Sequence, residues 1–466
     1  MNTVKIENAY ITLVDGDRGK NYPKQNDLSS TGDCLFLSAK NVTKEGFIFN
    51  EICFISSEKD SQLRAGKLER GDIVITTRGT IGNIAYFHEN IPYQNIRINS
   101  GMLIIRADEN YWDKYFLFIY LSSKIFQNQL ETFISGSAVP QLPAKDLKKM
   151  LLPKIALNTQ IKIRKIIKSF NDKITLNTQT NQTLEQIAQA IFKHWFIDFA
   201  PVHAKANALA RGETIEQAEL AAMACLSGKT VEKITALKTQ DPTAYHQLQQ
   251  TAQAFPSEFV ESEMGLVPKG WERTTLTHIC EMKNGYAFKS KEWTDEGIPV
   301  IKIGSVKPML IELDNGSFVA AENETLRADF LASEGDILVG LTGYVGEVGR
   351  IPYQEKAMIN QRVAKFMPKK ITETMNYYCF IYCLARQKEF KAFTEMNAKG
   401  SAQANISTKE ILSYPVIIAT KEIHIAFENT VKNLLDKIIV NSGENSTLTK
   451  TRDELLPRLL SGEIEL

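Results

Sequence analysis

The sequence predicts an α+β fold in which two pseudo-symmetric mixed α/β domains are separated by a two-helix antiparallel coiled coil. Three observations carry this prediction: an internal repeat, short strand-like runs inside each repeat, and a long heptad pattern that closes each repeat. The length of 466 residues also requires more than one hydrophobic core.

The composition is that of an ordinary globular protein, with 43% hydrophobic and 23% charged residues, which excludes disordered and fibrous classes. No apolar run approaches the length of a membrane span, and the start "MNTVKIENAY" lacks the apolar core of a signal peptide. We therefore expect a cytoplasmic location and no membrane contact. Because the net charge is only +1, any surface for nucleic acid has to be local.

The repeat has a fixed offset of 264 residues, since "GDIVITTRGTIGNIAY" begins at Gly71 and "GDILVGLTGYVGEVGR" begins at Gly335. The same offset aligns "FLSAKNV" with "VIKIGSV", "GSAVPQL" with "GSAQANI", and "DKITLN" with "DKIIVN". One register that runs through roughly 150 residues indicates two copies of one unit.

The repeat and the composition shifts divide the chain into five segments. We expect a first domain over residues 1–155, a first spacer helix over 156–200, a helical connector over 201–262, a second domain over 263–418, and a second spacer helix with the C-terminal tail over 419–466.

Inside each domain, runs such as "DIVITT" and "GMLIIRA" predict strands that are separated by turns. The segments "YWDKYFLFIYLSSKIFQNQLETF" and "MNYYCFIYCLARQKEFKAFTEM" have helical spacing, and each is expected to form one core helix. The repeated glycines are expected at turns that need positive φ angles: Gly71, Gly79, Gly82, Gly335, Gly343 and Gly346.

A heptad seam follows the first domain and returns after the second. In the first copy it consists of Ile163, Ile167, Phe170, Ile174, Asn177, Asn181, Leu184, Ala188, Ile191 and Trp195. In the second copy it consists of Phe427, Val431, Leu434, Ile438, Asn441, Asn445, Leu448, Arg452, Leu455 and Leu459, with Arg452 as the misfit.

The asparagines lie at the middle of each seam, which matters for an antiparallel pair. Asn177 would then face Asn445 and Asn181 would face Asn441, so that polar layers fix the register. The alternative is that these asparagines are merely tolerated in a partly solvated seam. Such a pair of helices would be about 50 Å long, and it would hold the two domains apart at its opposite ends.

Several motifs together resemble the specificity subunit of type I restriction-modification enzymes: "SEMGLVPKGWE", the repeated "GDIxxxxxGxxG" and "GSAxxxI", and the tails "LEQIAQAIFKHWFIDFAPV" and "LLPRLLSGEIEL". The resemblance covers nearly the whole chain. It implies two target recognition domains that each read one half of a bipartite, asymmetric site on double-stranded DNA, with the helices as a ruler.

The resemblance also implies partners. The subunit would recruit two modification subunits, which methylate adenine, and through them the restriction subunits. This chain itself would be non-catalytic and would bind no cofactor, whereas the complex would use S-adenosylmethionine, ATP and Mg through its partners. The sequence agrees, since no "NPPF" or "DPPY" methyltransferase loop and no complete phosphate loop occurs.

Candidate DNA-binding residues are the polar side chains in the loops of each repeat, because bases and phosphates are read by Arg, Lys, Asn, Gln, Ser and Thr. In the first copy they are Lys40, Asn41, Arg78, Thr80, Arg97 and Ser137. In the second copy they are Lys302, Ser305, Thr342, Tyr344, Arg362, Ser401, Gln403 and Asn405. Arg97 in "NIRI" and Arg362 in "NQRV" match at an offset of 265, and for both a structural ion pair is an equal alternative to a phosphate contact.

A further apolar set lies near the helix ends: Trp195, Phe196, Leu455, Leu456, Leu459 and Leu460. It predicts either burial against the neighbouring domain or, as the resemblance implies, an interface for the modification subunits. From the physics alone, a non-DNA adaptor with two ligand-binding globules on a coiled-coil strut is the second functional hypothesis, and the near-neutral charge favours it.

Overall fold

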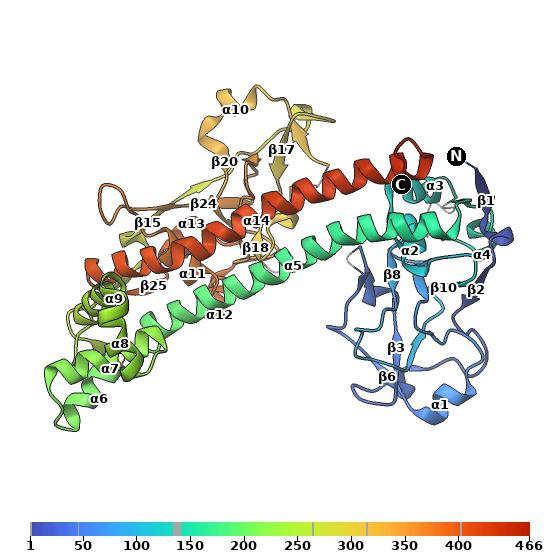
Figure 1. Cartoon of the computed structure of the whole chain (residues 1–466). Helices are drawn as coiled ribbons and strands as arrows, with labels where there is room; N and C mark the ends of the chain where they lie inside the picture. The colour runs from blue at the N-terminus through green and yellow to red at the C-terminus, as the bar shows by residue number, and fades with distance from the viewer. Residues whose placement is uncertain (1, 45, 134–140, 263–264, 314–315, 401–402) are drawn as a thin grey trace. The chain divides into compact units, whose positions relative to one another are not determined.

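The computed structural model describes residues 2–466 apart from 45, 134–140, 263–264, 314–315 and 401–402. Its internal contacts define two compact units, Met1–Ile174 with Ser446–Leu466, and Thr175–Asn445. Each unit therefore combines one mixed α/β domain with a part of both long helices, α5 and α14 (Figure 1). The division between the two units falls within both long helices.

The first domain contains β1 (Thr3–Lys5), β2 (Ile11–Asp15), β3 (Cys34–Leu37), β4 (Val42–Thr43), β5 (Gly46–Phe47), β6 (Phe54–Ile55), α1 (Ser57–Gln62), β7 (Ile73–Thr76), β8 (Ile84–Tyr86), β9 (Ile96–Ile98), β10 (Met102–Ala107), α2 (Lys114–Ser122), α3 (Lys124–Phe133), α4 (Ala144–Leu147) and β11 (Leu151–Pro153).

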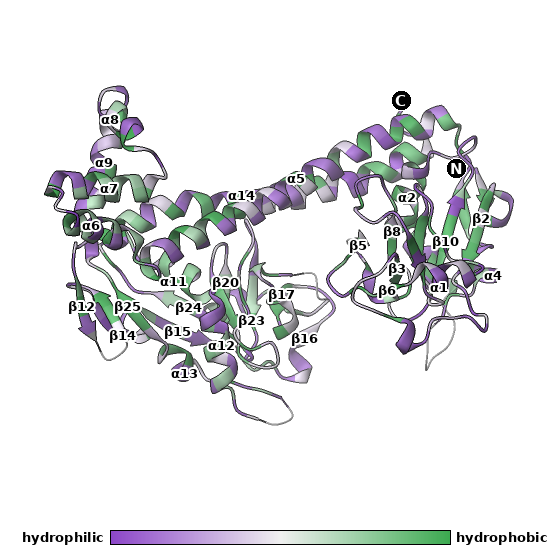
Figure 2. Ribbon diagram, turned by 90° about the horizontal axis from the view of Figure 1, so that it is seen from below, coloured by the Kyte–Doolittle hydropathy of each residue, from purple (hydrophilic) through white to green (hydrophobic). Residues whose placement is uncertain are grey.

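Its central sheet has the order β2-β10-β7-β8, and a smaller sheet has the order β6-β3-β9. The central sheet is buried on both faces. On one face, Ile73 and Ile105 pack in the same core as Phe116 of α2, and on the other face Val74 and Ile104 pack against the smaller sheet. Burial on both faces explains why these strands are almost continuously apolar, as the colours of Figure 2 show for β10.

The second domain contains β12 (Phe259–Ser262), β13 (Gly265–Pro268), β14 (Glu272–Thr275), β15 (Cys280–Asn284), β16 (Trp293–Thr294), β17 (Ile298–Ile301), β18 (Met309–Leu310), β19 (Phe318–Val319), α10 (Asn323–Leu326), β20 (Leu331–Ser333), β21 (Ile337–Gly340), β22 (Val348–Arg350), β23 (Lys356–Ile359), β24 (Val363–Pro368), α11 (Tyr378–Ala385), α12 (Lys388–Asn397), α13 (Thr408–Leu412) and β25 (Pro415–Ile418).

The two domains repeat one architecture. The strand order β15-β24-β21-β22 matches β2-β10-β7-β8. Strands β17, β19, β21 and β22 lie 264 positions after β3, β6, β7 and β8, and helix α12 lies 264 positions after α3. The predicted pair of pseudo-symmetric mixed α/β domains is therefore confirmed.

The prediction of one core helix in each domain is wrong in one respect, because each segment forms two helices. These are α2 and α3 in the first domain, and α11 and α12 in the second. In the first domain, Ser123 ends α2 with an extended backbone, and its hydroxyl donates to the Tyr120 carbonyl at 2.6 Å. In the second domain, Gln387 has the same extended conformation before α12. A hydroxyl that satisfies a terminal carbonyl ends a helix without any glycine or proline, so that the periodicity gives no sign of the break.

The long helices α5 (Leu157–Phe196) and α14 (Lys421–Ser461) run antiparallel and pack together (Figures 1 and 2). The seam is apolar near the domains, where Ile163, Ile167 and Val431 are fully buried. Arg452, the predicted misfit, donates to the Asn171 side chain at 2.9 Å. No helix in the described part of the chain has both the length and the apolar character that crossing a membrane requires.

The connector folds into α6 (Ala200–Ala210), α7 (Ile215–Ser227), α8 (Val231–Gln240) and α9 (Pro242–Ala254). A buried lysine connects the first helix of the connector to the end of its last helix. The Lys205 ammonium of α6 donates to the carbonyls of Ala252 at 3.0 Å and Phe255 at 2.6 Å. These carbonyls close α9, where a positive charge is favourable.

Candidate nucleic-acid interface

A tight turn between two central strands presents the first group of predicted residues. In the first domain it connects β7 to β8, and it closes through a hydrogen bond from the Gly82 amide to the Thr76 carbonyl at 3.0 Å. Gly79 and Gly82 have φ angles of 74° and 89°, so the prediction of positive φ at these glycines is confirmed. Arg78 and Thr80 stand exposed on this turn.

A second loop packs against the turn in both domains. The Leu142 amide donates to the Thr77 carbonyl at 3.1 Å, and the repeat-related Ile406 amide donates to the Leu341 carbonyl at 2.9 Å. The pairs Arg78–Gln141 and Thr342–Asn405 form equivalent backbone bridges. The two domains thus build one backbone frame, which carries different side chains.

In the second domain the predicted residues gather on this frame. Thr342 donates from its hydroxyl to the Asn405 side chain at 2.6 Å. Arg362 donates to the Gln403 side chain at 3.1 Å. Tyr344 is 69% exposed at the tip of the turn, so the face of its ring is open to solvent. Bases or sugars are surfaces that such a ring contacts well.

The remaining predicted residues of this group lie on or directly before two short 3-10 helices, Ala39–Asn41 and Ile303–Ser305. Lys40 and Lys302 are exposed, and the Lys302 ammonium lies 4.5 Å from the centre of the Trp293 ring. Asn41 and Ser305, which are repeat mates, are buried. Asn41 uses its amide internally, since it donates to the Glu51 carbonyl at 2.9 Å.

Arg97 is also committed inside the protein, since it is 6% exposed and forms an ion pair with Asp60. It donates further to the carbonyls of Ala65 at 2.8 Å and Leu63 at 3.2 Å. Desolvation raises the pKa of Asp60, but hydrogen bonds from Lys67 and Arg97 outweigh it and lower that pKa to about 2. Of the two alternatives for Arg97, the structure therefore contains the ion pair.

The predicted match between Arg97 and Arg362 is wrong. In the parallel pairing of β3 with β9, Phe36 faces Arg97, and in the equivalent pairing of β17 with β23, Val300 faces Met358. Arg362 instead corresponds to Gly101, because the Leu341 amide donates to the Arg362 carbonyl as the Thr77 amide donates to the Gly101 carbonyl. The segment between β8 and β9 is longer than its counterpart in the second domain, which shifts the local alignment.

Ser137 and Ser401 lie outside the described residues. One residue that the sequence reasoning missed is Arg18, which lines a pocket of about 170 Å³ together with Asp15, Arg78 and Gln141. Its guanidinium pairs with Asp15 at 3.0 Å. No repeat signal covers this segment, and only the fold brings it beside the turn.

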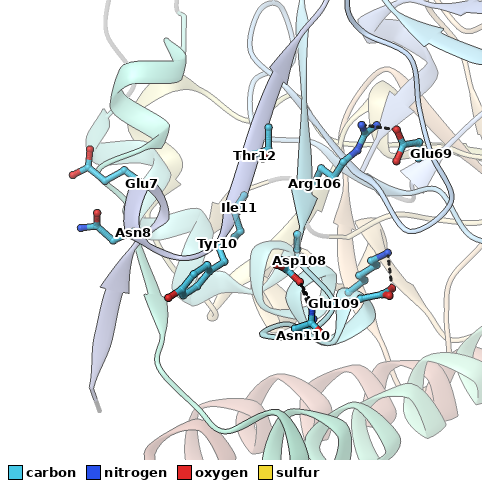
Figure 3. Close-up of a pocket in the computed structure, with 12 residues that line it drawn as sticks. Glu7, Asn8, Tyr10, Ile11, Thr12, Glu69, Arg106, Asp108, Glu109 and Asn110 are labelled. Atoms are coloured by element: carbon cyan, nitrogen blue, oxygen red, sulfur yellow. Dashed lines mark hydrogen bonds and ion pairs between the residues drawn. The ribbon is translucent and has the colours of Figure 1, made fainter.

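A larger pocket of about 850 Å³ lies at the edge of the central sheet of the first domain (Figure 3). Its charges do not suit a polyanion, because Glu7, Glu69, Asp108 and Glu109 line it. Its Arg106 is neutralised by Glu69 at 2.6 Å. By volume alone this pocket would be the candidate DNA-binding site, but its negative charge makes the loops around Arg78 the better candidate.

The seam asparagines pair across the two helices. Asn177 donates to the Asn445 side chain at 2.9 Å, and Asn441 donates to the Asn181 side chain at 2.8 Å. These are the partners that antiparallel pairing predicts. Asn177 also donates to Glu444 at 2.8 Å.

The apolar set near the helix ends is mostly interior. Trp195 and Phe196 pack in the core of the second unit, and Leu456, Leu459 and Leu460 pack in the core of the first unit. Leu455 alone in this set keeps intermediate exposure. Burial against a domain, one of the two predicted alternatives, is thus what the structure contains.

The family model described as "Type I restriction modification DNA specificity domain" matches residues 13–186 and again 268–449. The chain is similar to the type I restriction enzyme HindI specificity subunit of Haemophilus influenzae, with 33% identity over 96% of this chain and 98% of the relative. It is also similar to the type I restriction enzyme MjaIX specificity subunit of Methanocaldococcus jannaschii, with 25% identity over 93% of this chain and 88% of the relative.

Among solved structures, the S subunit of the type I restriction-modification system of M. genitalium aligns with a TM-score of 0.45 and 18% identity, over 98% of this chain and 95% of that chain. The HsdS subunit of Thermoanaerobacter tengcongensis aligns with a TM-score of 0.33 and 14% identity, over 99% of this chain and 97% of that chain. With two matches to the family model and a relative that is aligned over nearly the full length, the chain belongs to the type I restriction modification DNA specificity family, as the non-catalytic DNA specificity subunit of such a system.

Proposed function

We propose that this subunit reads a bipartite, asymmetric site on double-stranded DNA, with one half-site for each mixed α/β domain. The observation that carries the proposal is the repeated frame of turn and packed loop, which presents different side chains in the two domains. Arg78 and Gln141 in the first domain occupy the positions of Thr342 and Asn405 in the second. Arginine pairs best with guanine and asparagine or glutamine with adenine, so one backbone frame with different residues selects different bases.

The exposed residues of these frames are proposed to make the contacts: Arg78, Thr80, Lys40, Tyr344, Arg362, Gln403, Asn405 and Lys302, together with Thr342. Ser137 and Ser401, which lie outside the described residues, remain proposed contacts on their place in the repeat alone. Asn41, Ser305 and Arg97 are proposed to support the loops, because their side chains are buried. Helices α5 and α14 are proposed to set the unread gap between the half-sites.

The complex is proposed to contain two adenine-methylating modification subunits, and restriction subunits that bind through them. S-adenosylmethionine, ATP and Mg are assigned to these partners. In the part of this chain that the structure describes, no three His, Cys, Asp or Glu side chains are grouped as metal ligands. Partners are proposed to dock along the helices, where Leu455 is the member of the predicted apolar set that keeps some exposure. A cytoplasmic location fits action on cellular DNA.

The test is selection from random duplex pools, with and without the modification subunits, at low and at physiological salt, since phosphate contacts weaken as salt rises. Enrichment of a gapped two-part motif supports the proposal, and absence of enrichment at low salt contradicts it. Replacing Arg78 by Ala should weaken selection in one half-site about tenfold, and replacing Tyr344 by Ala should weaken it in the other. Each variant serves as the control for the opposite half-site.

A further inference from the structure

A chain of charged side chains connects the turn of the second domain to helix α5. The turn ends at Glu347, whose amide donates to the Tyr344 carbonyl at 3.3 Å and whose carbonyl accepts from the Gly340 amide at 2.9 Å. The backbone of Glu347 therefore closes the turn that carries Tyr344. Its carboxylate points the other way, to Arg386 at 3.5 Å and to Lys391 of α12 at 2.9 Å.

Arg386 continues the connection, because its Nε donates to the Glu185 carboxylate of α5 at 3.2 Å. The second oxygen of Glu185 accepts from the Tyr382 hydroxyl at 2.7 Å. The side chains of Arg386, Glu185 and Glu347 are 19%, 9% and 16% exposed. Partial burial of three charges, with one guanidinium between two carboxylates, makes this contact stronger and more directional than a surface ion pair.

Among the residues that the structure describes, this connection is found in the second domain and has no counterpart in the first. The repeat mates of Arg386, Glu347 and Glu185 are Ser122, Asn83 and Thr449, which carry no charge. In the first domain the turn is held instead by Gln127, whose amide donates to the Gly82 carbonyl at 3.2 Å. A contact that core packing alone required would be expected in both copies of the fold.

We propose that Arg386 is a positioning residue for DNA recognition by the second domain: it ties the turn that carries Tyr344 to helix α5 through Glu347 and Glu185. This inference rests on the proposed function, in which that turn contacts bases. It implies that sequence selectivity in one half-site depends on a residue that lies behind the reading surface and touches no DNA.

The experiment uses the full-length subunit, assembled with its modification subunits, in selection from random duplex pools. The variants are Arg386→Gln, Arg386→Lys, Glu185→Gln and the double variant of Arg386→Gln with Glu185→Gln. The control is Arg327→Gln, which removes an ion pair to Glu292 at 2.7 Å in the same domain, at comparable exposure and without contact to the turn. Each Tm is measured so that selection is compared among folded proteins.

We expect Arg386→Gln to reduce base discrimination about tenfold in one half-site and to leave the other unchanged. Arg386→Lys should recover part of the loss, because it keeps the charge but loses the planar fork that spans two carboxylates. The double variant should lose little more than Arg386→Gln alone, since both residues act in one connection.

Equal losses in both half-sites, or an equal loss with Arg327→Gln, would overturn the positioning role and leave only destabilisation. Unchanged discrimination with Arg386→Gln would overturn it as well. Failure of the proposed function looks different, because the unmodified subunit would then select no two-part motif at all.

Discussion

At the scale of single residues, His424 shows how the core can make stability depend on pH. Its ring is stacked on Phe196 with centroids 5.3 Å apart, and its Nε2 accepts from the Ala419 amide at 3.2 Å, which requires a neutral imidazole. Burial lowers the pKa of His424 from 6.5 to about 3.

Because the folded pKa lies below the unfolded pKa, the unfolded chain binds the proton first as pH falls. The contribution of His424 to the free energy of unfolding is therefore fully present above pH 6.5 and declines as the pH falls below that value. At pH 5 the loss from this residue alone is about 2 kcal/mol. Replacing His424 by Gln keeps an acceptor for Ala419 and removes the titration, so the decline between pH 7 and pH 5 should become shallower by about that amount.

Urea unfolding at several pH values, followed through the transition of the second unit, measures this effect. The matched control is His246→Gln, which makes the same replacement at an exposed position. A profile for His424→Gln that runs parallel to that of the unmodified protein would refute the assignment.

Residue roles were the least predictable feature of the sequence. The fixed offset located the turn glycines and the frames, because backbone conformation depends on local residue type. It did not reveal that Arg97 finds Asp60, or that Arg362 replaces Gly101, because those facts depend on loop lengths and on a partner distant in sequence. Arg386 was missed for the same reason, since no motif connects it to Glu185.

At the scale of elements, the heptad pattern predicted both long helices and their antiparallel pairing. It did not predict how much of each helix is buried beside the seam, where Phe192, Leu435 and Leu456 are nearly inaccessible. Each helix packs on its partner and on a domain at once, so the apolar stripe is wider than a coiled coil needs. A two-helix seam alone would leave these residues exposed.

The asparagine layers lead to a prediction about register. Replacing Asn177, Asn181, Asn441 and Asn445 together by Leu should raise Tm by on the order of 5 °C, because buried polar layers cost stability relative to apolar ones. The same change should broaden the distribution of gap lengths in selected DNA, because the layers no longer specify one alignment of the helices.

Calorimetry and sequencing of bound duplexes give these two measurements. Exposed Gln179 on the same helix is the matched control, and Gln179→Leu should change neither. A lower Tm with an unchanged gap distribution would show that the asparagines do not set the register.

At the scale of the whole molecule, the family assignment decides between the two functional hypotheses. The near-neutral charge had favoured a non-DNA adaptor, but both domains match the DNA specificity model. Net charge misleads here because the candidate contacts are confined to loops, while acidic surfaces such as the pocket around Glu109 balance them elsewhere.

A ruler function predicts the effect of lengthening both helices. Inserting one heptad into α5 and the matching heptad into α14 adds about 10 Å to the pair, which corresponds to about three base pairs. The selected motif should keep both half-site sequences and gain that many unread positions. If the half-site sequences changed and the gap stayed the same, the helices would not be what sets the gap.

The buried residues at the helix ends have a consequence for assembly. Phe192, Trp195 and Phe196 are the repeat mates of Leu456, Leu459 and Leu460. The core of the second unit therefore packs aromatic rings at the positions where the core of the first unit packs leucines. If the first domain with α5 met a second copy of itself, aromatic rings would meet a core that packs leucines and would overpack it. For the second domain with α14, leucines would meet a core that packs rings and would leave it underfilled. The two halves of the chain have thus diverged into unlike packing partners, and we expect each half to pair better with the other half than with a copy of itself.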